Sequence, residues 1–290
     1  MATVIETAAM RSAIALSALG VGTTSPNPPV GCVILDSSHQ IVGQGYHHRK
    51  GEPHAEALAL DEAGARAHGG TAVVTLEPCN HHGRTPACHA ALIDAGISRV
   101  VIALIDPTSR GEGGAAKLHA AGVDVEVGLL PEEAELVLGP WMRTLHTRRP
   151  VLWWVTGHGA SKPDVGVLSG LRSRADAIIH ADGRITEAVP NSHGGGILAL
   201  PQALTPHQPV ATVQALFDGG ARTALLEADQ DMAEPFLRCG LIDHVAVVLT
   251  EELPTIPREV KVGLVPDGFA LDRVTKEGAA VIVEATRVRP

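Results

Sequence analysis

The sequence predicts an α/β protein built from two domains. Short apolar runs that suit strands alternate with stretches of helical spacing, which is typical of an α/β layer with a largely parallel sheet. The chain has 290 residues, whereas an average domain has about 150. A stretch with three arginines that ends in proline, residues 141–150, is the expected boundary. We therefore expect domains over residues 1–145 and 150–290.

The first domain begins with a helix, because Met10, Ile14 and Leu16 lie at helical spacing before a proline-rich break. A polar stretch separates two strands of a hairpin, and Pro53 suits the first turn of the next helix. The expected order is a helix over 7–19, strands over 30–35 and 41–46, a helix over 53–67, a strand over 71–76, a helix over 85–96, a strand over 100–105, a loop with Gly111, Gly113 and Gly114, a helix to 121, a strand over 123–127 and a helix from 131.

The second domain repeats the alternation more sparsely. The expected elements are a strand over 151–155, a helix over 167–175, strands over 176–180 and 223–227, a helix over 232–239 and a strand over 244–250. Residues 194–196 are three glycines, which we interpret as a surface loop.

Charge and hydropathy exclude several classes of function. The 32 acidic and 23 basic residues give a formal net charge of −9, which disfavours sequence-independent binding to nucleic acid. The apolar runs are far shorter than the roughly 20 residues of a membrane helix, and the N-terminus lacks the basic start of a signal peptide. We therefore expect a cytoplasmic protein that binds neither nucleic acid nor membrane.

The four cysteines are too few for a disulfide scaffold in a chain of this length. Cys32 and Cys239 are expected to be buried small apolar residues. The other two lie in a window, residues 39–89, that holds eight of the fifteen histidines. This crowding favours metal binding.

His54, Cys79 and Cys88 form the candidate metal site. His54 is expected in the first turn of one helix, Cys79 at the end of a strand and Cys88 in the first turn of the next helix. One imidazole and two thiolates are a three-ligand Zn²⁺ set that leaves a fourth position for water. Positive charge at helix N-termini favours the ionised sulfurs.

Glu56 is the candidate proton shuttle. It follows His54 by two residues, so both can face one metal only if the metal lies off the end of the helix. Zinc lowers the pKa of its water from about 15.7 to about 7, and a carboxylate beside it can pass the proton to a ring nitrogen and then to a leaving amine. The expected reaction is hydrolytic loss of ammonia from an aminated heterocycle. The alternative is a closed, noncatalytic site of a zinc-stabilised binding protein, with a fourth ligand from His81, His82 or His89.

His54-Ala55-Glu56 with Pro78-Cys79 resembles the motif of the zinc nucleobase deaminases. The longer string from Leu76 to Cys88, with eight residues between the cysteines, resembles the deaminase half of the bifunctional riboflavin-biosynthesis deaminase/reductase family. The stretches 24–31, 43–47 and 51–56 agree with it. The resemblance implies a cytidine-deaminase-like three-layer domain that deaminates 2,5-diamino-6-ribosylamino-4(3H)-pyrimidinone 5′-phosphate.

The same resemblance implies three substrate contacts. Asn27 and His47 would contact the substrate, and Arg84 would meet its phosphate. We also expect a homo-oligomer, a dimer or a tetramer. A deaminase of another nucleobase or nucleotide is the alternative within the same enzyme class.

The second domain resembles the reductase half of that family only in part. Residues 169–178 and 236–243 carry the likeness, which implies a smaller, divergent dihydrofolate-reductase-like fold. The family's Gly-Gly after a strand-end glutamate is here Ala228-Asp229, and residues 179–185 replace a second glycine loop. Side chains now stand where backbone should approach phosphate. We therefore predict that NADPH is not bound, that reductase activity is lost, and that the domain serves packing or oligomer assembly. A persisting bifunctional enzyme is the alternative.

Overall fold

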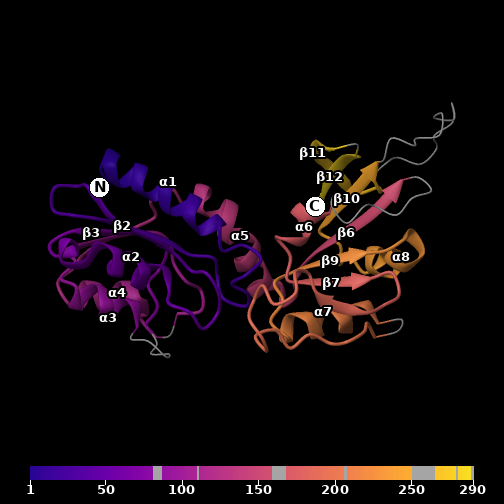
Figure 1. Cartoon of the computed structure of the whole chain (residues 1–290), viewed down its shortest axis with the longest axis horizontal. Helices are drawn as coiled ribbons and strands as arrows, with labels where there is room; N and C mark the ends of the chain where they lie inside the picture. Colours follow the sequence, from indigo (N-terminus) through magenta and orange to yellow (C-terminus); the bar gives the residue numbers. More distant parts are fainter. Residues whose placement is uncertain are drawn as a thin grey trace. The chain divides into compact units, whose positions relative to one another are not determined.

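The chain folds into two compact units, Met1–Met142 and Arg143–Pro290, each around a sheet of its own (Figure 1). The computed structural model describes residues 1–80, 87–109, 111–158, 168–205, 208–249, 265–278 and 280–288. Within these ranges, no helix combines the length and the apolar character needed to cross a bilayer.

The N-terminal unit contains a five-stranded sheet in the order β2-β1-β3-β4-β5. Its elements are α1 (Val4–Ala18), β1 (Gly31–Leu35), β2 (Ile41–Tyr46), α2 (Ala55–Ala63), the 3₁₀ helix η1 (Gly64–Ala67), β3 (Thr71–Leu76), α3 (Cys88–Asp94), β4 (Arg99–Leu104), α4 (Gly113–Ala120), β5 (Asp124–Val127) and α5 (Pro131–Thr147). Helices α1 and α5 cover one face of the sheet, and α2, α3 and α4 cover the other (Figure 1). The α/β prediction and the three-layer arrangement are confirmed.

The sheet topology brings the candidate site residues to one edge. Strands β3 and β4 are parallel, with Leu76 paired to Leu104, so the segments that follow them leave the sheet at the same end. Helix α2 leads into β3 and α3 leads out of it, so the N-terminus of each helix lies at the carboxyl end of β3. His54, Cys79 and Cys88 occupy these ends.

Helix α2 packs closely on β2 because that strand carries glycine where the two meet. A Cβ on Gly43 would lie 2.0 Å from the carbonyl oxygen of Ala59. The helix is shorter than predicted: it begins at Ala55, after the N-cap His54, and Gly64 with φ 55° ends it before the 3₁₀ turn. His54 is therefore not in the first helical turn as expected but immediately before it.

The C-terminal unit contains a seven-stranded mixed sheet in the order β11-β12-β10-β6-β9-β7-β8. Its elements are β6 (Val151–His158), α6 (Ser169–Arg172), β7 (Ala177–His180), β8 (Ile185–Glu187), α7 (Pro209–Asp218), β9 (Thr223–Glu227), α8 (Gln230–Arg238), β10 (His244–Leu249), β11 (Phe269–Glu277) and β12 (Ala280–Arg287). One apolar cluster includes residues of α7 and α8, and a second, which includes α6, lies on the opposite face of the strands.

Three expectations for this unit need correction. Strands β8, β11 and β12 and helix α7 were not predicted, and α6 is a single turn rather than a helix over 167–175. Most residues of β11 are exposed on an edge strand, so the strand lacks the apolar alternation by which it could be recognised. Cys239 is exposed rather than buried, because it lies at the C-cap of α8, beyond the buried Phe236.

A buried ion pair joins the start of the unit to β10. Arg149 donates from Nη1 to Asp243 Oδ2 at 2.6 Å and from Nη2 to Oδ1 at 2.9 Å, and the amide of Leu152 also donates to Asp243. Burial raises the pKa of Asp243, but the hydrogen bonds and charge of Arg149 outweigh burial and hold that pKa below its usual value.

Candidate metal centre and active site

The structure brings the three predicted ligands together. The donor atoms of His54, Cys79 and Cys88 all lie within 4.8 Å of one another. His54 Nδ1 is 3.3 Å from Cys88 Sγ, and the two sulfurs are 3.4 Å apart. Both cysteines are free thiols.

The local backbone explains this arrangement. His54 has extended dihedrals at the N-cap of α2, where its side chain forms no cap hydrogen bond. The N-cap of α3, Ala87, also provides no side-chain cap, and the amide of Cys88 donates instead to Cys79 Sγ at 3.3 Å. The sulfur thus accepts one of the amide protons that a helix N-terminus leaves without an intrahelical partner.

The pKa values of the two sulfurs are shifted in opposite directions. The hydrogen bond between the two sulfurs, opposed by burial and assisted by His54, lowers the pKa of Cys79. The same hydrogen bond, together with burial and the charge of Glu56, raises the pKa of Cys88. Both sulfurs must be thiolates to bind a metal ion, so binding of a cation here would release any proton that they carry.

The donor set fits a zinc ion. Tetrahedral coordination with Zn–S of about 2.3 Å and Zn–N of about 2.0 Å places donors about 3.5–3.8 Å apart. The observed separations of 3.3 and 3.4 Å need a change of only a few tenths of an ångström. Among the described residues, these three form the one group of histidine, cysteine and carboxylate donors close enough to share an ion.

Glu56 lies against this group from the first turn of α2. It is 3% exposed, and His54, Cys79 and Cys88 are among the neighbours that influence its pKa. Burial raises the pKa of Glu56, while the charge of His54 opposes the rise. A carboxyl group with a raised pKa next to a metal site is suited to accept and return a proton near neutral pH.

Asn27 and His47 lie next to each other beside the candidate ligands. His47 Nδ1 is 3.2 Å from the carbonyl oxygen of Pro53 and donates to it, so Nε2 accepts from Asn27 Nδ2 at 3.1 Å. The His47 and His54 ring centroids are 5.1 Å apart. Burial lowers the pKa of His47 to about 4, so its ring is neutral at pH 7.

Some predicted residues lie outside the described part of the chain. These are Arg84 and two of the three alternative zinc ligands, His81 and His82. The third, His89, is described: its Nδ1 donates to the carbonyl oxygen of Cys79 at 3.1 Å. Its ring is thus held by the backbone of a candidate ligand, and His89 is not among the described donors that lie close enough to share an ion.

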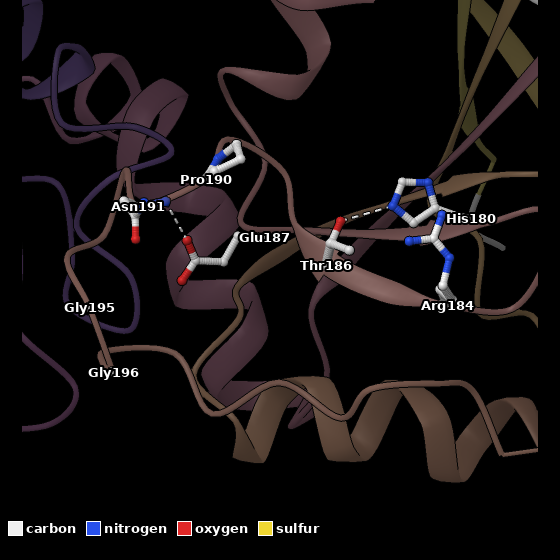
Figure 2. A pocket seen from close by; sticks show the side chains of 8 residues that line it. All are labelled: His180, Arg184, Thr186, Glu187, Pro190, Asn191, Gly195 and Gly196. Carbon is white, nitrogen blue, oxygen red and sulfur yellow. Dashed lines mark hydrogen bonds between the residues drawn. The ribbon is translucent and has the colours of Figure 1, made fainter.

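The sequence prediction assigned no role to two other features. Glu77, two residues before Cys79, is a buried carboxylate with partners on two other elements. In the C-terminal unit, a cavity of about 490 Å³ lies beside β7 and β8, and two of the three consecutive glycines, Gly195 and Gly196, line it (Figure 2). For Glu77, a sequence signal was available, because this residue stands immediately before the Pro78-Cys79 motif.

Comparison with known proteins places the chain in a family. Residues 4–104 match the family model of the cytidine and deoxycytidylate deaminase zinc-binding region. The diaminohydroxyphosphoribosylamino-pyrimidine deaminase of Buchnera aphidicola subsp. Schizaphis graminum is 46% identical over 142 residues, which are 49% of this chain and 96% of that protein. The riboflavin biosynthesis protein RibD of Mycobacterium tuberculosis is 35% identical over 275 residues, covering 77% of this chain and 78% of that protein. This chain belongs to the riboflavin-biosynthesis deaminase/reductase family.

Other members of the riboflavin-biosynthesis deaminase/reductase family agree in fold. The RibD protein of Escherichia coli K12 is 50% identical over 144 residues, so this match spans 49% of the chain and 39% of that protein. A crystal form of Acinetobacter baumannii RibD superposes with a TM-score of 0.79 at 24% identity and covers 98% of this chain and 99% of that one. The predicted family, its fold and the hydrolytic deaminase class are confirmed.

Proposed function

We propose that the chain is a zinc-dependent deaminase in which His54, Cys79 and Cys88 hold the metal and Glu56 moves the proton. The convergence of one imidazole and two sulfurs within 4.8 Å carries this proposal. A zinc ion held there would act as a Lewis acid and make water nucleophilic at neutral pH. The three side chains would orient it, and the buried surroundings would limit access of bulk solvent.

Glu56 supplies the proton chemistry of this proposal. Its carboxylate takes a proton from the attacking water and delivers it to the ring nitrogen next to the reacting carbon. It then takes the remaining proton from the added hydroxyl and passes it to the amino group, so that the C=O bond forms as the C–N bond breaks. The products are the carbonyl compound and ammonia, so no oxidant or reductant is consumed. A single carboxylate can perform both transfers because burial raises its pKa.

We propose 2,5-diamino-6-ribosylamino-4(3H)-pyrimidinone 5′-phosphate as the substrate. The Buchnera relative is named as a deaminase of this compound class, and this chain covers 96% of that protein. The hydrogen bond between Asn27 and His47 supports this substrate, because the pair can offer uncharged hydrogen-bond donors and acceptors to a pyrimidine. The contact of Arg84 with the phosphate stays a prediction.

The experiment is metal removal and return. The purified chain should contain one zinc, lose ammonia release after treatment with a chelator, and regain it with added Zn²⁺. The diaminopyrimidine nucleotide is compared with cytidine, deoxycytidylate and guanine to separate the proposed substrate from other aminated bases. Full activity of the metal-free chain would contradict the zinc assignment, and preference for another base would contradict the substrate.

We also propose that the C-terminal unit is a divergent reductase-like domain without reductase activity. At the end of β9, Asp229 caps α8 by accepting from the amide of Met232 at 3.0 Å, so a carboxylate holds the helix N-terminus that would otherwise suit a phosphate. Trp154 Nε1 donates to the carbonyl oxygen of Ala228 at 2.9 Å. Glu227 is paired with Arg172 through two hydrogen bonds.

The segment that replaces the family's second glycine loop lies between β7 and β8, and its side chains likewise pair with nearby residues of the same region. Arg184 pairs with Asp182 at 2.7 Å. His180 Nε2 lies 2.8 Å from Thr186 Oγ1 (Figure 2). We propose that this domain instead serves packing or homo-oligomer assembly. Sedimentation of the intact chain tests assembly, and the four free cysteines fit the reducing cytoplasm that we propose as its location.

A further inference from the structure

Glu77 connects the segment that carries Cys79 to two neighbouring elements. Its carboxylate is 5% exposed. Oε2 accepts from Ser109 Oγ at 2.8 Å and from the amide of Asp106 at 3.3 Å, both in the loop after β4. Oε1 accepts from the amide of Ala115 at 2.9 Å, in the first turn of α4. One side chain thus joins the ends of β3 and β4 to the start of a helix.

Helix α4 depends on this carboxylate for its N-terminal cap. The residue at its N-cap, Glu112, forms no side-chain cap hydrogen bond. Glu77 therefore supplies, from another strand, an acceptor for an amide that the helix leaves without an intrahelical partner. A negative charge also interacts favourably with the positive end of the helix dipole.

The glycine-rich loop allows this contact. A Cβ on Gly113 would lie 2.3 Å from Glu77 Oε1, and its φ is +82°. A Cβ on Gly114 would lie 1.9 Å from the carbonyl oxygen of Pro78. Glycine at 114 thus lets α4 approach the Pro78 backbone, and glycine at 113 adopts a positive φ and leaves room for the Glu77 carboxylate. The loop therefore packs directly against Glu77 and Pro78, the two residues before Cys79.

The backbone next to Cys79 is held from both sides as a result. The amide of Glu77 donates to the carbonyl oxygen of Leu104 at 2.8 Å, which extends the pairing of β3 with β4. The carbonyl oxygen of Cys79 accepts from the amide of His89 at 3.3 Å and from its Nδ1 at 3.1 Å. Through the amide of Ala115, the Glu77 side chain ties the Cys79 segment to α4.

We propose that Glu77 is a positioning residue that sets the placement of the Cys79 sulfur in the metal site. The inference rests on the proposed function, because it concerns how well the three donors hold a metal. Glu77 does not touch the reacting atoms in this account. It acts through the backbone of Pro78 and Cys79, as partners of metal ligands commonly do.

The test compares Glu77→Gln with Glu112→Gln. Glutamine keeps the volume, but its amide group can accept through one oxygen only, so the amide of either Ala115 or Asp106 loses its acceptor. Glu112→Gln removes the same charge near the same helix end without touching the network. We expect Glu77→Gln to weaken Zn²⁺ binding about 10- to 100-fold and to change the absorption bands of the Co²⁺-substituted chain, and Glu112→Gln to do neither.

Ser109→Ala is a second, milder variant, because it removes one donor to Glu77 from the surface loop. It should shift zinc affinity in the same direction by a smaller factor, and it decides the question if Glu77→Gln fails to fold. Unchanged zinc affinity and an unchanged cobalt spectrum in Ser109→Ala and in any folded Glu77→Gln overturn the proposal, even if thermal stability falls. Failure of the unmodified chain to bind Zn²⁺ or Co²⁺ would instead contradict the proposed function.

Discussion

Helices α2 and α3 of the N-terminal unit and helix α8 of the C-terminal unit begin in opposite ways. In the N-terminal unit, α2 and α3 begin without a side-chain cap, and the His54 ring and Cys79 sulfur lie at these ends. In the C-terminal unit, α8 begins with Asp229, whose own carboxylate accepts from the first turn. Both units place helix N-termini after strand ends, where α/β proteins commonly bind ligands.

This difference shows that strand and helix order alone does not create a binding site. An uncapped helix end leaves backbone donors and positive potential for an external group, whereas a carboxylate cap satisfies the same donors internally. Three side chains with metal-binding atoms meet at the uncapped ends. At the capped end, Glu227 and Ala228 are engaged by Arg172 and Trp154.

The largest expected effect concerns Glu56. Glu56→Gln should lower kcat for ammonia release by about 10²- to 10⁴-fold, because the amide cannot carry the proton, while bound zinc stays at the level of the unmodified chain. Steady-state kinetics and metal analysis measure the two quantities. Asp61→Asn, on the exposed side of the same helix, is the matched control and should retain full activity. Equal activity of Glu56→Gln and the control would remove Glu56 from the mechanism.

Zinc removal should affect the two units unequally. A ligand at 1,000 times its dissociation constant stabilises a protein by about 4 kcal/mol, and all three donors belong to the N-terminal unit. Hydrogen-exchange mass spectrometry follows each unit separately. We expect chelation to increase exchange around Cys79 and Cys88 and to leave β9 and α8 unchanged. A uniform change over both units would show that the metal does not act locally.

The ion pair of Arg149 and Asp243 should matter for the C-terminal unit alone. Asp243→Asn leaves Arg149 largely buried without its anion and should lower the free energy of unfolding of that unit by about 3 kcal/mol. Because the folded pKa of Asp243 lies below its unfolded value, the stabilisation is complete above about pH 4 and is lost as the pH falls through the folded pKa.

Urea unfolding at neutral and acid pH measures this contribution. The unmodified chain should lose stability on acidification, and the Asn variant should lose less. Asp182→Asn, in an exposed pair, is the control and should change stability by less than about 1 kcal/mol. An Asn variant with the same acid dependence as the unmodified chain would assign the effect to other carboxyl groups.

The smallest expected effect tests the capped helix. Asp229→Ala removes the acceptor for the amide of Met232 and should lower the stability of the C-terminal unit by about 1 kcal/mol. Asp231→Ala, in the same first turn, is the control for charge. Titration with NADPH should show no binding to either variant, since Ala228 and the Arg172–Glu227 pair remain. NADPH binding by Asp229→Ala would show that the cap alone closes the site.

The sequence predicted most of the N-terminal unit because its signals are local. Alternating strands and helices gave its sheet, and the rare residue types at His54, Cys79 and Cys88 identified the donors before their distances were known. The start of α1 was missed although Thr3 and Glu6 form a capping box, a pattern readable in the sequence.

The remaining differences depend on contacts between distant residues. Glu77 accepts hydrogen bonds from Ser109 and Ala115, which are more than thirty residues away in the sequence. The local sequence around Glu77 does not indicate these partners. Strand β11 is mostly exposed and depends on pairing with β12. Cys239 is exposed because its helix ends there, and residue type alone could not indicate this.

The most direct test follows ammonia and NADPH in one reaction. The zinc-loaded chain is mixed with the diaminopyrimidine nucleotide and NADPH, and ammonia release and nicotinamide absorbance are recorded together. We expect one ammonia to be released for each substrate molecule, with no loss of NADPH. Loss of NADPH in step with ammonia would contradict the assignment of the C-terminal unit, and the absence of ammonia would contradict the metal centre.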